Sequence, residues 1–445
     1  MDMSTVKVTL ALEATWGVPA KHEDIPNAYV KADKKEHLKI QLHVSQAMEA
    51  TRTHSRNSAP QTRRRSCLSC VRACTASSRP VDSGVSSCTL DCWMLVLASV
   101  YMLYWKVDDG QLVVVGVYVD DLLATGTDAA AVDRFFDQLG SLSIKDLGTV
   151  SKFLGMRVEI DGDGTYVLDQ SEAIGELVRE HGLENDNSTR APIGADCYDV
   201  QPEYGTLLGL SGKDRMQGTR TFQSLVGSLL WVVRCTRPDI AFAVHKETRQ
   251  THQPRVHELK LAKRIARYLK GTHDFKLQMT PTKSSNGELQ LESYSDADFA
   301  DKSDRKSLTC GIIRLNGMPV SWTVKKQGGV SLSTMEAEFV AASEQARKLL
   351  GIREILCEIV KPPAFPMVSH VDNQAAIKQS AGEASSLKAK HIDVRVKFVC
   401  DIDRRGVVAA RFVRSEFQLA DLLTKALDAA KLAKMCKLLR LGNSQ

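Results

Sequence analysis

Long apolar runs are missing from this sequence of 445 residues, and its amino terminus lacks a charged region followed by an apolar core. A helix needs roughly 20 apolar residues to cross a bilayer, and a signal peptide needs that amino-terminal pattern. We therefore expect an intracellular protein without a membrane partner. A large excess of one charge is missing too. The 59 Lys and Arg residues and 53 Asp and Glu residues leave a formal charge of +6, which permits a nucleic-acid partner without requiring one.

The length and the 43% of hydrophobic residues allow two or three domains, each with a core. Five cysteines crowd into one short segment: Cys67, Cys70, Cys74, Cys88 and Cys92. The spacing of Cys67 and Cys70 is compatible with a zinc site. Residues 51–87, however, have no helical or strand periodicity and are rich in Arg, Ser and Thr, which is typical of a disordered basic linker.

Two adjacent carboxylates stand between apolar runs in Tyr118-Val119-Asp120-Asp121. The β-branched residues of 112–119 and the apolar residues of 122–124 predict two strands with the acids at the tip. Adjacent carboxylates repel each other, so a fold keeps them together chiefly where a divalent cation neutralises them. Pairs of such ions drive phosphoryl transfer on nucleotides. The alternative is an ordinary Asp-Asp turn.

Four further acids stand at the ends of predicted elements in the last third of the chain. They are Asp296 after the alternating strand 288–294, Glu336 in a capped helix start, Asp372 after the strand 368–371, and Asp421 at the start of the last helix. Each acid taken alone is also compatible with a helix cap or a surface residue.

Residues 257–270 have the pattern of an amphipathic helix, with Leu261, Ile265 and Leu269 at helical spacing and Gly271 as its end. Five basic residues share the polar side: Lys260, Lys263, Arg264, Arg267 and Lys270. This stripe predicts contact with a phosphate backbone, and a solvated face is the alternative.

Three groups of residues together resemble the Pol polyprotein of Ty1/copia-type retrotransposons over its reverse transcriptase and RNase H. They are Asp24-Ile25-Pro26-Asn27-Ala28-Tyr29, the acid box at 118–121 and the ordered acids of the last third. The resemblance implies an α+β fold, in which a polymerase palm-like antiparallel sheet with helices precedes an α/β RNase H-like domain with a mixed sheet. The implied domains are a partial fingers and palm at 1–186, a helical thumb or connection region at 187–285, and the RNase H-like domain at 286–445.

The same resemblance implies a polymerase site that holds two Mg²⁺ or Mn²⁺ ions. Its catalytic, metal-binding carboxylates are Asp24, Asp120 and Asp121. Tyr29 matches an aromatic residue that excludes a ribose 2′-hydroxyl, and Tyr118 is expected to contact the substrate as well. Lys145 matches a lysine that protonates the leaving pyrophosphate as a general acid, and a solvated lysine is the alternative.

In the RNase H-like domain the resemblance implies that Asp296, Glu336, Asp372 and Asp421 hold two Mg²⁺ ions. Such ions activate a water molecule and stabilise the departing 3′-oxygen. Asp298 and Glu338 lie one strand alternation or about one helical step away from the first two acids. The position of the family motifs favours Asp296 and Glu336.

One family motif, Tyr-Gly-Leu-Lys-Gln-Ala, is absent as written. A shifted reading frame over residues 74–84 can encode Tyr-Gly-Leu-Lys-Gln-Ala-Gly-Arg-Leu-Trp; free third codon bases make single matches easy, but a consecutive run of this length is hard to obtain by chance. We therefore expect a frameshift, by mutation or by gene modelling, over about 51–101. The motif supplies a Gln that contacts the incoming nucleotide, so the polymerase site is expected to be incomplete.

The expected function is an impaired RNA-directed DNA polymerase joined to a ribonuclease H. Its partners would be an RNA template, a DNA primer, an RNA/DNA hybrid and deoxynucleotides, in a cytoplasmic particle or the nucleus. Two alternatives are an inactive retrotransposon remnant and a domesticated nucleic-acid-binding protein, which would keep the basic helix and lose cleavage.

Overall fold

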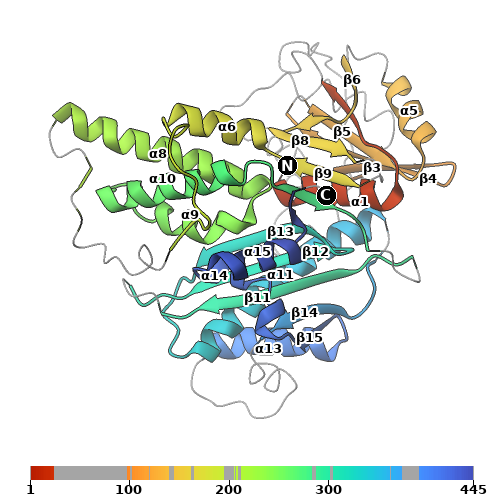
Figure 1. The fold of residues 1–445 in the computed structure, drawn as a ribbon. Coiled ribbons are helices and arrows are strands. Elements are labelled where there is room, and N and C mark those ends of the chain that lie inside the picture. Colours follow the sequence, from red (N-terminus) through yellow and green to blue (C-terminus); the bar gives the residue numbers. More distant parts are fainter. Residues whose placement is uncertain are drawn as a thin grey trace, which may run out of the picture. The chain divides into compact units, whose positions relative to one another are not determined.

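The computed structural model describes residues 2–24, 98–100, 103–119, 121–139, 145–161, 165–194, 205, 207–208, 212–282, 287–300, 304–360, 362–372 and 390–443. They form two compact units (Figure 1). Unit 1 is Met1–Phe153 with Gly351–Pro362, and unit 2 is Leu154–Leu350 with Pro363–Gln445. The five clustered cysteines, Tyr29 and Asp120 lie outside the described residues, as does the proposed frameshift apart from 98–100. The three domains inferred from the sequence stay a prediction.

Unit 1 is built on a six-stranded sheet of spatial order β2-β3-β4-β5-β1-β6, and every neighbouring pair in it is antiparallel. The palm-like antiparallel sheet was expected from the sequence. Its strands are β1 (Lys21–Asp24), β2 (Ala98–Val100), β3 (Leu103–Asp108), β4 (Gln111–Tyr118), β5 (Asp121–Gly126) and β6 (Lys145–Thr149). The unit also contains α1 (Met3–Trp16), α5 (Ala129–Gln138), β7 (Lys152–Phe153) and the end of α11 (Thr334–Ile359).

The hairpin of β4 and β5 confirms the strand pair predicted around the acid box, because Tyr118 pairs with Asp121 in its register. Val119 in the turn has a φ of 56°, as tight two-residue hairpin turns require. Both faces of the hairpin are covered, which explains its nearly continuous apolar sequence. One face packs on Ala131, Val132 and Phe135 of α5, and the other belongs to a cluster with Ile355 and Ile359 of α11.

Unit 2 begins with strands and helices that precede its largest sheet. These are β8 (Met156–Ile160), β9 (Tyr166–Asp169), α6 (Ser171–Glu180), α8 (Gly212–Cys235), η2 (Pro238–Ile240), α9 (Ala241–Thr248), α10 (Val256–Gly271) and β10 (Lys276–Met279). The predicted amphipathic helix is α10, whose Leu261, Ile265 and Leu269 are buried. Strand β16 (Leu441–Gly442) pairs with β10 and so brings the end of the chain to the sheet of β8 and β9.

The largest sheet of unit 2 has the order β13-β12-β11-β14-β15. Strands β11 (Leu291–Asp298), β12 (Leu308–Leu315) and β13 (Met318–Lys326) are antiparallel, whereas β14 (Met367–Val371) and β15 (Val408–Phe412) run parallel to β11. This arrangement confirms the expected mixed sheet. The remaining elements are α13 (Lys390–Arg404), η3 (Ser415–Phe417), α14 (Asp421–Thr424) and α15 (Ala429–Leu438). In the part of the chain that the structure describes, no helix combines the length and apolarity needed to cross a bilayer.

Helices α14 and α11 cover opposite faces of this sheet. Adjacent residues of a strand point to opposite faces. On β12, the Cys310 thiol lies 3.1 Å from the carbonyl oxygen of Leu423 in α14. The next residue, Gly311, faces α11, where a Cβ atom would lie 2.4 Å from the side-chain carbonyl of Gln345. Glycine at 311 therefore permits the close approach of α11.

Candidate active site

A row of three charged residues crosses neighbouring strands of unit 1. In the register of the sheet, Asp24 at the end of β1 lies directly opposite Asp121 of β5 and Lys145 of β6. Directly opposed residues place their side chains on the same face. The structure therefore puts three of the residues predicted for the polymerase site on one face. Asp120 and Tyr29 lie outside the described residues, while Tyr118 is the partly buried residue that pairs with Asp121.

His22 belongs to the same face and was missed by the sequence reasoning. Its Nε2 atom lies 3.0 Å from Oδ1 of Asp121, and its ring meets the edge of Phe153 with centroids 5.4 Å apart. The imidazole therefore limits the orientations of the Asp121 carboxylate. The sequence did contain a signal for this contact. Residues two apart in a strand share a face, so His22 and Asp24 lie on the same side of β1.

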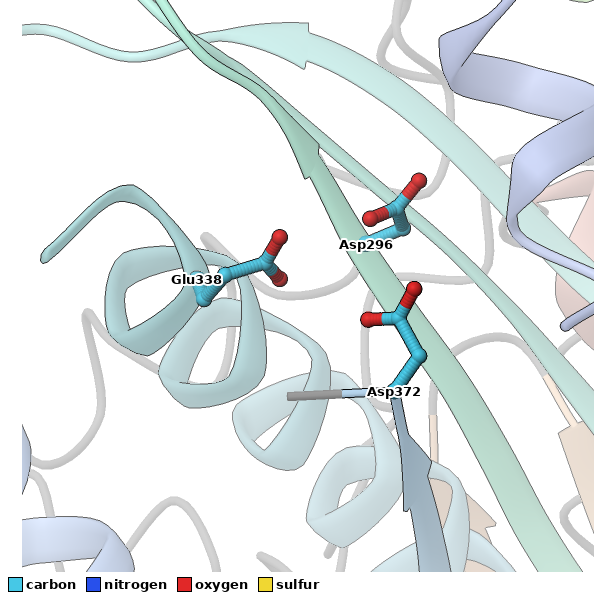
Figure 2. A group of neighbouring side chains, drawn as sticks. All are labelled: Asp296, Glu338 and Asp372. Atoms are coloured by element: carbon cyan, nitrogen blue, oxygen red, sulfur yellow. The ribbon is translucent and has the colours of Figure 1, made fainter. Parts of the chain in front are cut away.

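Three carboxylates of unit 2 form a tight cluster that includes two of the predicted acids. Asp296 of β11, Glu338 of α11 and Asp372 after β14 each offer an oxygen, and these three atoms lie within 4.8 Å of one another. Figure 2 shows the three side chains pointing toward one another. Asp296 and Glu338 are 2% and 9% exposed, and Asp372 is half-buried.

Glu336, which the family motif favoured, does not join this cluster. Its carboxylate accepts a 2.6 Å hydrogen bond from the backbone N–H of Leu332, and its own N–H donates to the hydroxyl of Ser333. It therefore caps the start of α11 in an arrangement that resembles a capping box, with Leu332 and not Ser333 as the backbone donor. Two residues along an α-helix correspond to a rotation of about 200°, so Glu336 and Glu338 point to different sides. Of the two glutamates, Glu338 is the one that α11 contributes to this cluster, and the assignment of the metal ligand stays a prediction.

Asp421, the fourth predicted acid, is 1% exposed and has two lysine partners. Its Oδ1 lies 2.6 Å from Nζ of Lys425, and its Oδ2 lies 2.8 Å from Nζ of Lys431. Lys425 also lies 3.2 Å from Oδ2 of Asp296, so one ammonium connects Asp421 to the cluster. Neither lysine was singled out in the sequence.

The electrostatics of the cluster fit a divalent cation. Burial raises the pKa of Glu338 well above its usual range, and the charges of Asp296 and Asp372 raise it further. Burial and Asp296 raise the pKa of Asp372 as well, against a lowering effect of Lys425. In addition, Oε2 of Glu338 is buried without a hydrogen-bond partner in the part of the chain that the structure describes. Hard divalent cations prefer such carboxylate oxygens.

The basic residues of α10 differ in their surroundings. Nζ of Lys270 contacts the backbone carbonyls of Glu184 and Asp186, so this lysine holds the loop after α6. Of the other basic residues on this helix, Lys260 is exposed, and Lys263, Arg264 and Arg267 are partly exposed. Their contact with a phosphate backbone stays a prediction.

Comparison with known proteins bears on this arrangement. Residues 1–195 match the family model described as reverse transcriptase (RNA-dependent DNA polymerase). The chain is 29% identical over 336 residues to the Retrovirus-related Pol polyprotein from transposon TNT 1-94 of Nicotiana tabacum, covering 75% of this chain and 24% of that protein. It is 31% identical over 314 residues to the corresponding polyprotein from transposon RE1 of Arabidopsis thaliana, covering 70% and 20%. The chain thus spans about a quarter or less of these polyproteins.

A shorter relative is covered over about three quarters of its length. The putative transposon Ty5-1 protein of Saccharomyces cerevisiae is 31% identical over 250 residues, which are 56% of this chain and 77% of that protein. Among solved structures, the foamy viral protease-reverse transcriptase in complex with an RNA/DNA hybrid is 10% identical, with a TM-score of 0.41 over 89% of this chain and 44% of that one. LC11-RNase H1 is 15% identical, with a TM-score of 0.25 over 32% and 97%. The sequence relatives show that the chain belongs to the Ty1/copia-type retrotransposon Pol polyproteins.

Proposed function

We propose that the carboxylate cluster of unit 2 cleaves the RNA strand of an RNA/DNA hybrid with the help of two Mg²⁺ or Mn²⁺ ions. The observation that carries this proposal is the convergence of Asp296, Glu338 and Asp372 within 4.8 Å from three separate elements. A buried group of acids is costly unless cations neutralise it. The family assignment supplies nucleic acid as the substrate class.

Asp296, Glu338 and Asp372 would hold the ions, with Asp421 as a fourth carboxylate beside them. Bound divalent ions activate a water molecule and stabilise the departing oxygen. Thr424 orients Asp296 through a 2.6 Å hydrogen bond from its hydroxyl. Because the pKa of Glu338 is raised, a cation held there would displace its proton, and cation binding would be linked to proton release.

The substrate would be recognised by its backbone shape and 2′-hydroxyls, not by base sequence. The exposed Lys260 and the partly exposed Lys263, Arg264 and Arg267 of α10 support this proposal, because cations that reach the surface neutralise phosphates in a salt-dependent manner. The family assignment is also the ground for proposing a cytoplasmic particle or the nucleus as the location.

The proposal is tested with the full chain and an RNA/DNA hybrid labelled on the RNA strand. We expect Mg²⁺-dependent cleavage by the wild type, loss of cleavage in Asp372→Asn, and retained cleavage in Asp401→Asn. Asp401 of α13 makes an exposed ion pair with Arg405, which follows the helix, so this variant removes a like charge outside the cluster. Absence of cleavage by wild-type protein with a cooperative unfolding transition would favour an inactive remnant or a domesticated binding protein.

A second activity, RNA-directed DNA synthesis, is favoured by the row of Asp24, Asp121 and Lys145. It would use an RNA template, a DNA primer and deoxynucleotides, with Asp120, Tyr29 and Tyr118 taking the roles that the family implies. Because the Gln-containing motif is absent as written, we expect weak primer extension. The test compares the wild type with Asp24→Asn and with Asp133→Asn, whose carboxylate pairs with Lys21 outside the row. Extension that survives Asp24→Asn would contradict this assignment.

A further inference from the structure

The side chain of Lys425 occupies the gap between two carboxylates of the cluster region. Its ammonium lies 2.6 Å from Asp421 and 3.2 Å from Asp296. Lys431 takes the other oxygen of Asp421, so both oxygens of this acid already have a cationic partner. The two ammoniums thus lie on the side of the cluster where Asp421 stands.

Among the described residues, no such cation pairs with the opposite side of the cluster. On that side, Oε2 of Glu338 is buried and lacks a hydrogen-bond partner among the described residues. The cluster is therefore asymmetric: two ammoniums pair with its Asp421 side, whereas its Glu338 side has a carboxylate oxygen without a described partner.

We propose that the ammonium of Lys425 occupies the position of the second divalent cation until that ion binds. This inference rests on the proposed two-ion nuclease. The first ion binds at Asp296, Glu338 and Asp372 with Lys425 in place. The second ion binds only after the ammonium of Lys425 leaves Asp296 and Asp421, because like charges a few ångströms apart repel each other strongly in a partly buried site.

The geometry allows this exchange. Lys425 follows α14 in an extended conformation, and its side chain is 45% exposed. A lysine has a flexible four-carbon stem whose charged end can turn to water. Asp421 would keep Lys431 as a partner when Lys425 moves, so the buried carboxylate is not left without a cation.

The first test counts the Mn²⁺ ions bound to the full chain by electron paramagnetic resonance and titration calorimetry. We expect two ions that the wild type binds and Asp296→Asn does not, one tighter and one weaker; any ions at the proposed polymerase site of unit 1 should remain in Asp296→Asn. Lys425→Met should bind the second ion at least about tenfold more tightly, which corresponds to about 1.4 kcal/mol. Lys425→Arg keeps the charge and should behave as the wild type does. Lys434→Met is the matched control, because Lys434 lies over the ring of Phe417 and is exposed.

The second test uses wild-type protein and so does not depend on how a variant folds. Acylation by acetic anhydride, read for each lysine by mass spectrometry, reports whether an ammonium is engaged. Lys425 should react slowly while only the first ion is bound and faster as the second site fills, and Lys434 should react at one rate throughout. A rate at Lys425 that stays constant while two ions bind would overturn the inference, as would equal second-ion affinity in wild type and Lys425→Met. If the wild type bound no more Mn²⁺ than Asp296→Asn does, this would instead overturn the proposed nuclease.

Discussion

The hydroxyl of Thr424 donates a 2.6 Å hydrogen bond to Oδ2 of Asp296 although 128 residues separate them in the chain. Both residues are almost fully buried. A buried donor of this kind fixes the orientation of a metal-binding carboxylate, as groups behind the ligands of metal sites commonly do.

We therefore expect Thr424→Val, which keeps the shape and removes the donor, to weaken Mn²⁺ binding and hybrid cleavage by about 10- to 100-fold. Thr424→Ser keeps a hydroxyl and should stay within a few-fold of the wild type. Calorimetric Mn²⁺ affinity and cleavage rate are the measurements. Equal Mn²⁺ affinities in the valine and serine variants would contradict the proposal that the Thr424 hydroxyl orients Asp296.

Substitutions of the two glutamates at the start of α11 distinguish which of them is the metal ligand. Glu338→Gln should reduce cleavage by at least about 100-fold, because it removes a proposed ligand and not merely a group behind one. Glu336→Gln should leave cleavage unchanged, since a glutamine still accepts the hydrogen bond from Leu332. The initial rates of hybrid cleavage at saturating Mg²⁺ give the comparison, and the reverse ranking would restore Glu336 as the ligand.

The buried pair of Arg237 and Asp239 is predicted to carry much of the stability of the helical part of unit 2. Both side chains have no exposed surface, with 2.7 Å between Nη2 and Oδ2. Arg237 also donates to Thr272, and Tyr268 donates to Asp239. Arg237→Met should lower the free energy of unfolding by about 3 to 5 kcal/mol, because it leaves a buried carboxylate without its cation. Urea unfolding measures this, and the double variant with Asp239→Leu should be less destabilised than the sum of the two single changes.

Glu247 makes stability depend on pH. It is 1% exposed, and burial followed by the charge of Glu258 raises its pKa from 4.5 to about 9. The folded state therefore holds a proton that the unfolded chain releases above pH 4.5. This contribution to stability is complete below pH 4.5 and is lost as the pH rises toward about 9.

Glu247→Gln should remove this decline, because glutamine stays neutral at every pH. At pH about 8 we expect a gain on the order of 1 to 3 kcal/mol in the free energy of unfolding, and near pH 5 little change. Glu184→Gln, on a side chain that is 60% exposed, is the control. Urea titrations at both pH values provide the data, and a parallel decline in the Glu247 variant and the wild type would show that another group is responsible.

Local patterns in the sequence were sufficient for much of the architecture. The apolar runs of 112–119 and 122–124 were enough for the β4–β5 hairpin, because its two strands are consecutive in the chain and are joined by a two-residue turn. The spacing of Leu261, Ile265 and Leu269 was enough for α10. The mixed sheet followed from the family motifs, since the order of strands is not encoded in any one segment.

The sequence could not decide whether Glu336 or Glu338 joins the carboxylate cluster. Periodicity states which residues of a helix share a side, but the side that meets the sheet depends on how α11 packs, including its close approach to Gly311. The contact of His22 with Asp121 spans 99 residues and depends on strand register.

The sequence by itself determined the family through its motifs, and with the family the antiparallel and mixed sheets; short-range periodicity was enough to place Asp296 and Asp372 near the ends of strands. The tertiary structure alone decided that Glu338 completes the cluster and that Lys425 and Lys431 neutralise Asp421. These are contacts between elements, and their geometry arises only when long-range packing sets helix rotation and strand register.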